Sequence, residues 1–206
     1  MNVHALIPLK DPAGGKTRLA RRLTAPQRIE LIRAMLEHVV GALRATPEIT
    51  DISVLTGDRS LVPHGCEAIP DGGLALNPAM TLAQGVLRRT KTGGWLVIVH
   101  ADLPFLKPAE VRALVLACRE DALVAAPDAA EKGTNALAFA LARPIATRFG
   151  PDSLSAHSEA AAAAGLELVR IRRPGLAADI DEPEQLESLA QRGDSRYAFL
   201  RGGAVK

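Results

Sequence analysis

The chain has 206 residues and a mass of 21.7 kDa, which suits one domain with a sizeable core and excludes a long multidomain assembly. Hydrophobic residues make up 48% and charged residues 23%, close to the averages of folded proteins, so a disordered chain is excluded. Aromatic residues are only 3% and the net charge is +2, which argues against a protein that stacks single-stranded nucleic acid in a basic groove. We therefore expect a folded domain without a nucleic-acid partner.

Cysteine usage and the first residues bear on the compartment. Cys66 and Cys118 have no CxxC partner, which indicates free thiols in a reducing environment. The chain shows no basic segment followed by an apolar stretch at its start, and no window reaches the ~18 apolar residues of a membrane span. We therefore expect a cytoplasmic protein that does not enter a membrane.

Strand and helix patterns alternate along the chain. Val3–Ile7 is a short apolar run closed by Pro8, which is typical of a buried strand. Thr24 and Gln27 have the spacing of a helix capping box, and apolar residues recur every three to four positions after it. The expected strands are 3–7, 52–55, 67–69, 95–99, 123–126, 136–140 and 167–171. The first expected helix runs from the capping box to a point before Pro47, and the others cover 78–89, 108–118 and 155–164.

This alternation predicts an α/β sandwich with a mostly parallel sheet, whose ligands bind over the carboxyl ends of the strands. The strands that follow one another after residue 123 indicate a mixed edge of the sheet. No repeat and no Pro/Ser-rich linker divides the chain. We expect one domain over residues 1–193, followed by a C-terminal tail, 194–206, that either frays or packs on a partner subunit in a homodimer.

The loop after the first strand is the first candidate site. Gly14–Arg18 combines glycines, which let backbone amides approach phosphate oxygens, with two cations. The segment does not fit a Walker A loop, because Lys10 stands where that pattern requires glycine and the next helix begins only at the capping box. The segment predicts a phosphate-binding loop, and a solvated basic turn is the alternative.

Three aspartates are candidates for a cation site. Asp102 follows the strand 95–99, and Asp179 and Asp181 stand two residues apart, so their carboxylates point to one side of an extended segment. Mg²⁺ prefers oxygen ligands and usually takes one or two protein carboxylates together with substrate phosphates. The alternatives are a turn role for Asp102 and a helix-capping role for Asp181 ahead of Pro183.

Two further segments, 132–136 and 149–153, are rich in small hydroxyl and amide donors and suit a small anion, with ordinary loop chemistry as the alternative. The histidines form no i, i+4 pair, and no serine or cysteine stands in a nucleophile elbow, so a hydrolytic triad has little support. Packing is the simplest role for His38 and Cys118.

Seven motifs follow one another along the chain: Ile7-Pro8-Leu9-Lys10, Lys16-Thr17-Arg18-Leu19, Leu76-Asn77-Pro78-Ala79, Ala101-Asp102-Leu103-Pro104, Gly133-Thr134-Asn135-Ala136-Leu137, Phe149-Gly150 with Ser153 and His157, and Asp179-Ile180-Asp181-Glu182-Pro183. Taken together and in this order, they resemble the guanylyltransferases of coenzyme F-420 biosynthesis, from residue 3 to about residue 189. The chain departs from that family's pattern at Gly14 and Gly15, where small residues other than glycine are common, and at His100, where proline is frequent.

The resemblance implies a three-layer, Rossmann-like nucleotidyltransferase fold of the GT-A type with a mostly parallel mixed sheet. It also implies transfer of GMP from GTP to 2-phospho-L-lactate, phosphoenolpyruvate or 3-phospho-D-glycerate, with release of pyrophosphate. The same resemblance implies a role for each group of residues. The catalytic residues would be Lys16, Arg18 and Asp102, and the nucleotide would be bound by Pro8, Lys16, Arg18 and Asn77. The acid would be bound by Thr134, Gly150 and Ser153, and one or two Mg²⁺ ions would be ligated by Asp102, Asp179 and Asp181.

Two alternatives to this activity remain open on the sequence. One is a related nucleotidyltransferase that uses another acceptor, such as a sugar phosphate or molybdopterin. The other is a non-catalytic nucleotide- or RNA-binding module, marked by the basic residues Arg18, Arg21, Arg22 and Arg28.

Overall fold

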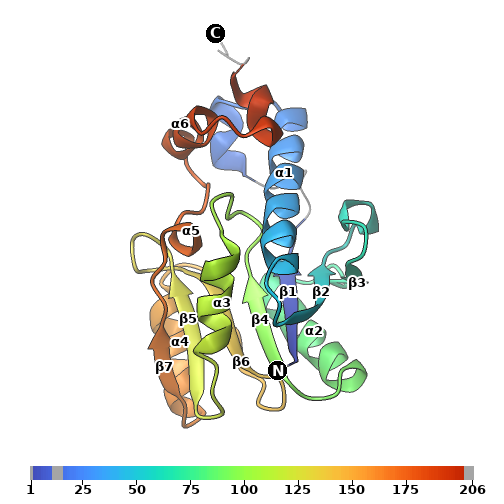
Figure 1. Cartoon of the computed structure of the whole chain (residues 1–206), viewed down its shortest axis with the longest axis vertical. Helices are drawn as coiled ribbons and strands as arrows, with labels where there is room; N and C mark the ends of the chain where they lie inside the picture. The colour runs from blue at the N-terminus through green and yellow to red at the C-terminus, as the bar shows by residue number, and fades with distance from the viewer. Residues whose placement is uncertain (1, 11–15, 202–206) are drawn as a thin grey trace.

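The computed structural model describes residues 2–10 and 16–201, and Figure 1 shows a central sheet with helices on both faces. The strands are β1 (Val3–Pro8), β2 (Ile49–Leu55), β3 (Glu67–Ile69), β4 (Trp95–Val99), β5 (Ala122–Pro127), β6 (Thr134–Ala140) and β7 (Glu167–Arg170). The α-helices are α1 (Ala25–Arg44), α2 (Leu76–Thr90), α3 (Pro108–Leu116), α4 (Ser153–Ala163), α5 (Pro174–Ala177) and α6 (Pro183–Gln191). Short 3-10 helices are η2 (Thr17–Arg21), η3 (Arg59–Leu61) and η4 (Ser195–Arg201).

Within the described residues, seven strands form one sheet in the order β3-β2-β1-β4-β6-β5-β7. The pairs β1–β2, β1–β4, β2–β3 and β5–β7 are parallel, whereas β6 runs antiparallel to both β4 and β5. The mostly parallel sheet with a mixed part is therefore confirmed. Because β1 and β4 are parallel neighbours, the loops after their carboxyl ends start side by side, where open α/β sheets bind ligands.

Alternating residues of each strand divide the core into two layers. Ile7 and Val97 belong to the cluster formed with α1, α3, α5 and α6, whereas Leu6 and Ile98 belong to the cluster formed with α2 and α4. This period of two follows from the pleat of a strand. Both faces of the sheet are thus buried, which gives the three-layer α/β arrangement that the sequence predicts (Figure 1).

The capping box at the start of α1 is confirmed. The Thr24 hydroxyl accepts a hydrogen bond from the backbone N–H of Gln27, and the Thr24 backbone N–H donates to Gln27 Oε1 at 2.9 Å. These contacts satisfy backbone donors that have no partner inside the helix. The helix start is therefore a local property, which explains why the sequence locates it.

Other element boundaries differ from the prediction. β2 begins at Ile49, three residues earlier than expected, because its polar residue Asp51 pairs with β1 beside His4. α2 begins at Leu76, ahead of Pro78, and the short helix η2 occupies part of the expected loop. Strand pairing and packing against the sheet decide these boundaries, and neither is visible in a local apolar pattern.

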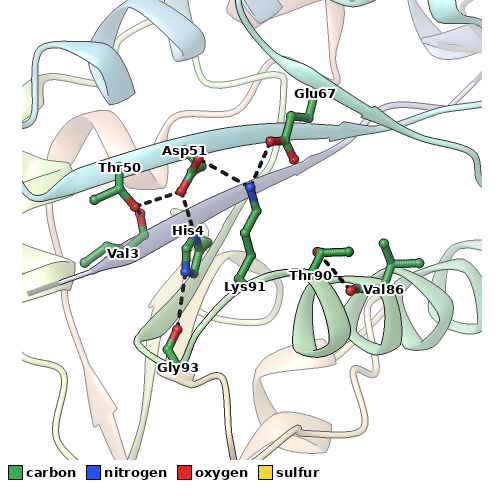
Figure 2. A network of polar contacts seen from close by, with 9 residues as sticks. All are labelled: Val3, His4, Thr50, Asp51, Glu67, Val86, Thr90, Lys91 and Gly93. Carbon is green, nitrogen blue, oxygen red and sulfur yellow. Dashed lines mark hydrogen bonds and ion pairs between the residues drawn. The ribbon is translucent and has the colours of Figure 1, made fainter.

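Figure 2 shows a polar network around His4, Asp51 and Lys91. His4 and Asp51 are paired near the amino ends of β1 and β2, so the network lies at the end of the sheet opposite the loops that follow β1 and β4. The buried ring of His4 lies between the carboxylate of Asp51, at 3.0 Å, and the carbonyl oxygen of Gly93, at 3.3 Å. Lys91 donates to Asp51 at 3.3 Å and to Glu67 at 2.8 Å. The network ties the connection between α2 and β4 to three neighbouring strands, which is a structural role.

The last described segment packs on the fold. Tyr197 of η4 is 1% exposed and lies in the same cluster as residues of α1 and α6, so the packed chain continues beyond residue 193. His38 of α1 is also held by packing, with Nε2 2.9 Å from the carbonyl oxygen of Leu106. As far as the structure describes the chain, its helices lack the combination of length and apolar character needed to cross a membrane.

Candidate active site

Lys16 joins two aspartates that are far from it in the sequence. Its Nζ donates to Asp102 Oδ2 and to Asp181 Oδ1, each at 2.6 Å, and only 10% of its side chain is exposed. Burial by itself lowers the pKa of a lysine, yet the charges of the two carboxylates outweigh this effect and raise the pKa of Lys16. Lys16 is therefore a fixed cation at the carboxyl edge of the sheet.

The backbone of Lys16 is in the left-handed region, with φ 52° and ψ 40°, just before η2. This conformation is uncommon for a residue with a side chain and is found where surrounding contacts stabilise it. Here the two carboxylates provide those contacts. Gly14 and Gly15, predicted to contact phosphates, lie outside the described residues.

Asp102 stands at the end of the turn that follows β4. Burial favours its protonated form, but the positive charge of Lys16 outweighs burial and lowers the pKa of Asp102. Its Oδ1 is buried and has no hydrogen-bond partner among the described residues. The carbonyl oxygen of Asp102 accepts from the backbone N–H of Ile180 at 3.2 Å, which fixes Asp102 beside the segment that carries Asp179 and Asp181.

Asp179 and Asp181 both line one cavity together with Asp102, as their spacing predicts. Burial is the main cause that raises the pKa of Asp179, and the negative charges of Asp102 and Asp181 add to it. Asn135 Nδ2 lies 3.4 Å from Asp179 Oδ1 and donates to the carbonyl oxygen of Leu176 at 2.9 Å. The carboxylates are thus crowded, and a cation beside Asp179 would relieve the repulsion.

The capping alternative for Asp181 is wrong. Glu182 is the N-cap of α6, and the backbone N–H groups of both Asp181 and Glu182 donate to Gln185 Oε1, at 2.6 and 2.7 Å. Pro183 occupies the first turn, where its missing N–H costs nothing. The Asp181 carboxylate is therefore available to Lys16.

The donor set suits an oxygen-ligated cation, although the expected three-aspartate ligand set is not preformed. Among the residues that the structure describes, no three His, Cys, Asp or Glu side chains converge closely enough to hold an ion. The unpartnered Oδ1 of Asp102 and the carboxylate of Asp179 are the oxygens that a cation would satisfy. Mg²⁺ needs only one or two protein carboxylates when phosphates and water supply its other ligands, so these residues fit it.

Two cavities meet at this cluster, and both are lined by Leu76, His100, Asp102 and Asp181. The smaller cavity, of about 230 Å³, is also lined by two cations, Lys10 and Lys16, and by apolar residues: Pro8, Leu9, Ile32, Met35 and Ala101. The larger cavity, of about 650 Å³, has a size typical of a small-molecule site. The structure therefore brings Pro8 and Lys16 together on one side of the carboxylates.

Thr134, Gly150 and Ser153 lie together in the wall of the larger cavity, which we name the acceptor cavity. The two predicted loops are joined by a hydrogen bond from the Leu154 N–H to the carbonyl oxygen of Lys132 at 2.9 Å. Gly150 has φ +140°, a value that side chains disfavour, and Ser153 begins α4 directly after this turn. Residues that are remote in the sequence thus form one polar surface.

The loop over 128–133 depends on a residue that the sequence reasoning missed. Asp128 accepts hydrogen bonds from the backbone N–H groups of Lys132, at 3.0 Å, and of Gly133, at 2.9 Å. A Cβ atom on Gly133 would lie 2.6 Å from Asp128 Oδ2, so a larger residue would displace this carboxylate from its two hydrogen bonds. The spacing gives no clear signal, because an aspartate usually bonds its own backbone two residues on, whereas Lys132 and Gly133 lie four and five residues after Asp128.

Asn77 does not line either cavity within the described structure. Its Nδ2 donates to the carbonyl oxygen of Phe149 at 2.9 Å, and its Oδ1 accepts from the Phe149 N–H at 2.8 Å. Both ends of the amide are therefore bound to the loop that carries Gly150. The geometry shows that Asn77 helps to shape the acceptor cavity, and its contact with the nucleotide stays a prediction.

The basic residues near η2 face acidic residues of the last helix. Arg18, whose side chain is 70% exposed, pairs with Glu182 at 2.9 Å, and Arg22 pairs with Glu187 at 3.0 Å. Arg18 also lines the acceptor cavity, whereas the resemblance assigns it to the nucleotide, and it is not among the described residues that line the smaller cavity with Pro8. These ion pairs reduce the free positive charge on which the RNA-binding alternative depends.

Comparison with known proteins identifies the family of the chain. Residues 3–202 match the family model described as guanylyl transferase CofC like. A protein of Sphaerobacter thermophilus named phosphoenolpyruvate guanylyltransferase is 35% identical to this chain, and the match covers 92% of this chain and 93% of that protein. A protein of the same name from Rubrobacter xylanophilus is 34% identical, and the match covers 96% of this chain and 98% of that protein.

Solved structures show the same fold. A protein from Desulfovibrio desulfuricans G20, crystallised as a candidate nucleotide-diphospho-sugar transferase, has a TM-score of 0.76 and 20% identity, over 97% of this chain and 94% of that one. A 4-diphosphocytidyl-2C-methyl-D-erythritol synthase has a TM-score of 0.62 and 14% identity, over 94% and 98%. The fold is thus that of the nucleotide-diphospho-sugar transferases and nucleotidyltransferases, and with the family match over nearly its whole length the chain belongs to the CofC-like guanylyl transferase family.

Proposed function

We propose that the protein transfers GMP from GTP to the phosphate of phosphoenolpyruvate, with release of pyrophosphate, as a step of coenzyme F-420 biosynthesis. The observation that carries this proposal is the position of Lys16, Asp102 and Asp181 at the junction of two cavities. A nucleotide in the smaller cavity and an acid in the acceptor cavity would meet at this cluster. The names of the relatives support phosphoenolpyruvate over the other acids.

The acceptor phosphate needs no general base. Its second pKa is ~6, so it is already largely a dianion at pH 7 and can attack phosphorus directly. The attack forms the new oxygen–phosphorus bond to the α-phosphorus of GTP and breaks the bond to pyrophosphate, which leaves with its electron pair. The protein has to align the two anions and offset their charge.

Lys16 can both align the anions and offset their charge, because two carboxylates hold its ammonium group in place before substrate binds. Its pKa is raised, so it keeps its charge over the physiological pH range. Thr134 and Ser153 supply small donors on the acceptor side, and Arg18, which is exposed and paired with Glu182, adds a cation to the wall of the same cavity.

We further propose that Asp102 and Asp179 hold Mg²⁺ when substrates bind, with Asp181 nearby. The bound ion would supply positive charge to the phosphates of GTP and to the pyrophosphate that leaves. The support is the buried, unpartnered Oδ1 of Asp102 in the described structure and the crowded carboxylate of Asp179.

The test is a panel of acceptors. The protein is incubated with GTP, Mg²⁺ and phosphoenolpyruvate, 2-phospho-L-lactate, 3-phospho-D-glycerate, a sugar phosphate or molybdopterin, and pyrophosphate and the diester are measured by mass spectrometry. We expect product with phosphoenolpyruvate, and loss of turnover with Asp102→Asn. Product with a sugar phosphate or molybdopterin alone would assign another acceptor class, and no product with any of the acceptors would refute guanylyl transfer.

A further inference from the structure

A buried histidine stands behind the acceptor cavity and contacts Thr134. His157 lies on α4, is fully buried, and is not among the described residues that line the cavity. Its Nδ1 is 3.1 Å from Thr134 Oγ1, and its Nε2 is 3.0 Å from the backbone nitrogen of Arg148. The ring of Phe149 packs edge-on against it at a centroid distance of 5.0 Å. The imidazole is therefore held on both of its nitrogen atoms.

These contacts determine which nitrogen carries the proton. The backbone N–H of Arg148 can only donate, so Nε2 of His157 must be the acceptor. A neutral imidazole with one acceptor nitrogen carries its hydrogen on the other, which is Nδ1. Burial is the main cause that lowers the pKa of His157 to about 4, so the ring is neutral at pH 7. A backbone interaction with Ser153 acts in the opposite direction and raises the pKa of His157, but burial outweighs it.

The tautomer determines the direction of the Thr134 hydroxyl. Because Nδ1 of His157 is a donor, Thr134 Oγ1 accepts from it and cannot donate back. Within the described chain this oxygen has no other hydrogen-bond partner, and Thr134 lines the acceptor cavity. The hydroxyl hydrogen is therefore free to point into the cavity.

We propose that His157 is a positioning residue that, through its Nδ1–H bond to Thr134 Oγ1, directs the Thr134 hydroxyl hydrogen to the anionic acceptor. Without this bond the hydroxyl can rotate and present its lone pairs, which repel an anion. The inference rests on the proposed function, because that function supplies the anion that enters the cavity.

The test compares two replacements of His157 that keep different halves of the ring. His157→Asn places an amide donor near the position of Nδ1 and keeps the bond to Thr134, whereas His157→Gln places an amide oxygen near the position of Nε2 and keeps only the bond to Arg148. Both variants lose the ring and its contact with Phe149, so a purely structural effect would change them alike. Pyrophosphate release is measured while GTP and phosphoenolpyruvate are varied in turn.

We expect His157→Gln to raise the KM for phosphoenolpyruvate about tenfold, the scale of one hydrogen bond to an anion, and to leave the KM for GTP unchanged. His157→Asn should stay near the wild type. Thr134→Val should match His157→Gln, and the double variant should be no worse than Thr134→Val, because both changes remove one interaction. The proposal would be overturned if the two His157 variants showed the same increase in the KM for phosphoenolpyruvate. It would also be overturned if the increase in the double variant were the product of the two single increases.

If the wild-type protein releases no pyrophosphate, the proposed function is refuted, but the positioning role of His157 can still be tested separately. In that case phosphoenolpyruvate binding is measured by calorimetry on the same variants. Weaker binding only in His157→Gln and Thr134→Val supports the positioning role, equal affinities overturn it, and a wild type that does not bind the acid overturns both ideas.

Discussion

Replacing Lys16 by methionine removes the cation that lies 2.6 Å from a carboxylate oxygen of Asp102 and of Asp181. Methionine keeps the length of the side chain, so the loss is mainly one of charge. Removing one partner of a buried ion pair costs about 3–5 kcal/mol, because the remaining charge stays buried without compensation. The Asp181 side chain is 48% exposed and is screened by water, so we expect a smaller loss, of about 2–3 kcal/mol.

For a chain of this length, 1 kcal/mol corresponds to about 2–4 °C in Tm, so the expected decrease is about 4–12 °C at neutral pH. Turnover should fall at least about 100-fold, because a preorganised charge at the reacting phosphates is lost. Differential scanning fluorimetry and pyrophosphate release measure the two effects on the same sample.

The loss of stability should depend on pH. In the wild type the pKa of Asp102 is lowered, so its contribution to stability is present above the ordinary carboxylate pKa and disappears as the pH falls through the lowered value. Without Lys16, burial dominates and we expect the pKa of Asp102 to rise, so the variant becomes relatively more stable as its carboxylate is protonated. The difference in Tm should therefore be largest near pH 7 and should narrow toward pH 4.

Lys91→Met is a matched control. Lys91 also bridges two carboxylates, those of Asp51 and Glu67, and its side chain is 13% exposed, but it lies at the opposite edge of the sheet (Figure 2). We expect this variant to lose stability and keep its turnover per folded molecule. A Tm difference for Lys16→Met that is the same at pH 7 and pH 4, or equal turnover in the two variants, would refute the reasoning.

Three further changes test separate parts of the structure. Gly133→Ala should lower Tm and raise the KM for the acid, because its Cβ would lie 2.6 Å from Asp128 Oδ2; unchanged kinetics would contradict this packing. Gly41→Ala, in an exposed part of α1 where a Cβ meets nothing within 4 Å, should instead raise the free energy of unfolding by about 0.5–1 kcal/mol, and a lower urea midpoint would contradict it. Asn77→Ala should raise the KM for the acid and not for GTP, because its amide holds Phe149; a change in the KM for GTP alone would restore the nucleotide role.

Much of the fold was predictable because its determinants are local. The capping box of Thr24 and Gln27 and the apolar period after it set the start of α1, and the apolar run Trp95–Val99 matches β4 residue for residue. The start of β2 was not predictable, because Asp51 joins that strand through pairing with β1 and contact with His4. An apolar pattern carries no information about such long-range pairs.

The candidate site was predictable as a set of residues but not as a geometry. Asp102, Asp179 and Asp181 were identified from their places after strands and from their spacing, and all three line one cavity. Asn77 belonged to a recognisable motif, yet its amide binds the backbone of Phe149, a contact 72 residues away in the sequence. Roles that depend on such partners are decided only when the chain is folded.

The sequence by itself determined the α/β class, the mostly parallel sheet and the positions where charge concentrates, because these follow from local periodicity and from the ends of strands. The small net charge of +2 gives no sign of this distribution. Only the tertiary structure decided that Lys16 lies between carboxylates 86 and 165 residues away, and that His157 fixes the hydroxyl of Thr134. The physical reason is that electrostatic and hydrogen-bond partners are chosen by distance in space, which the order of strands in the sheet sets.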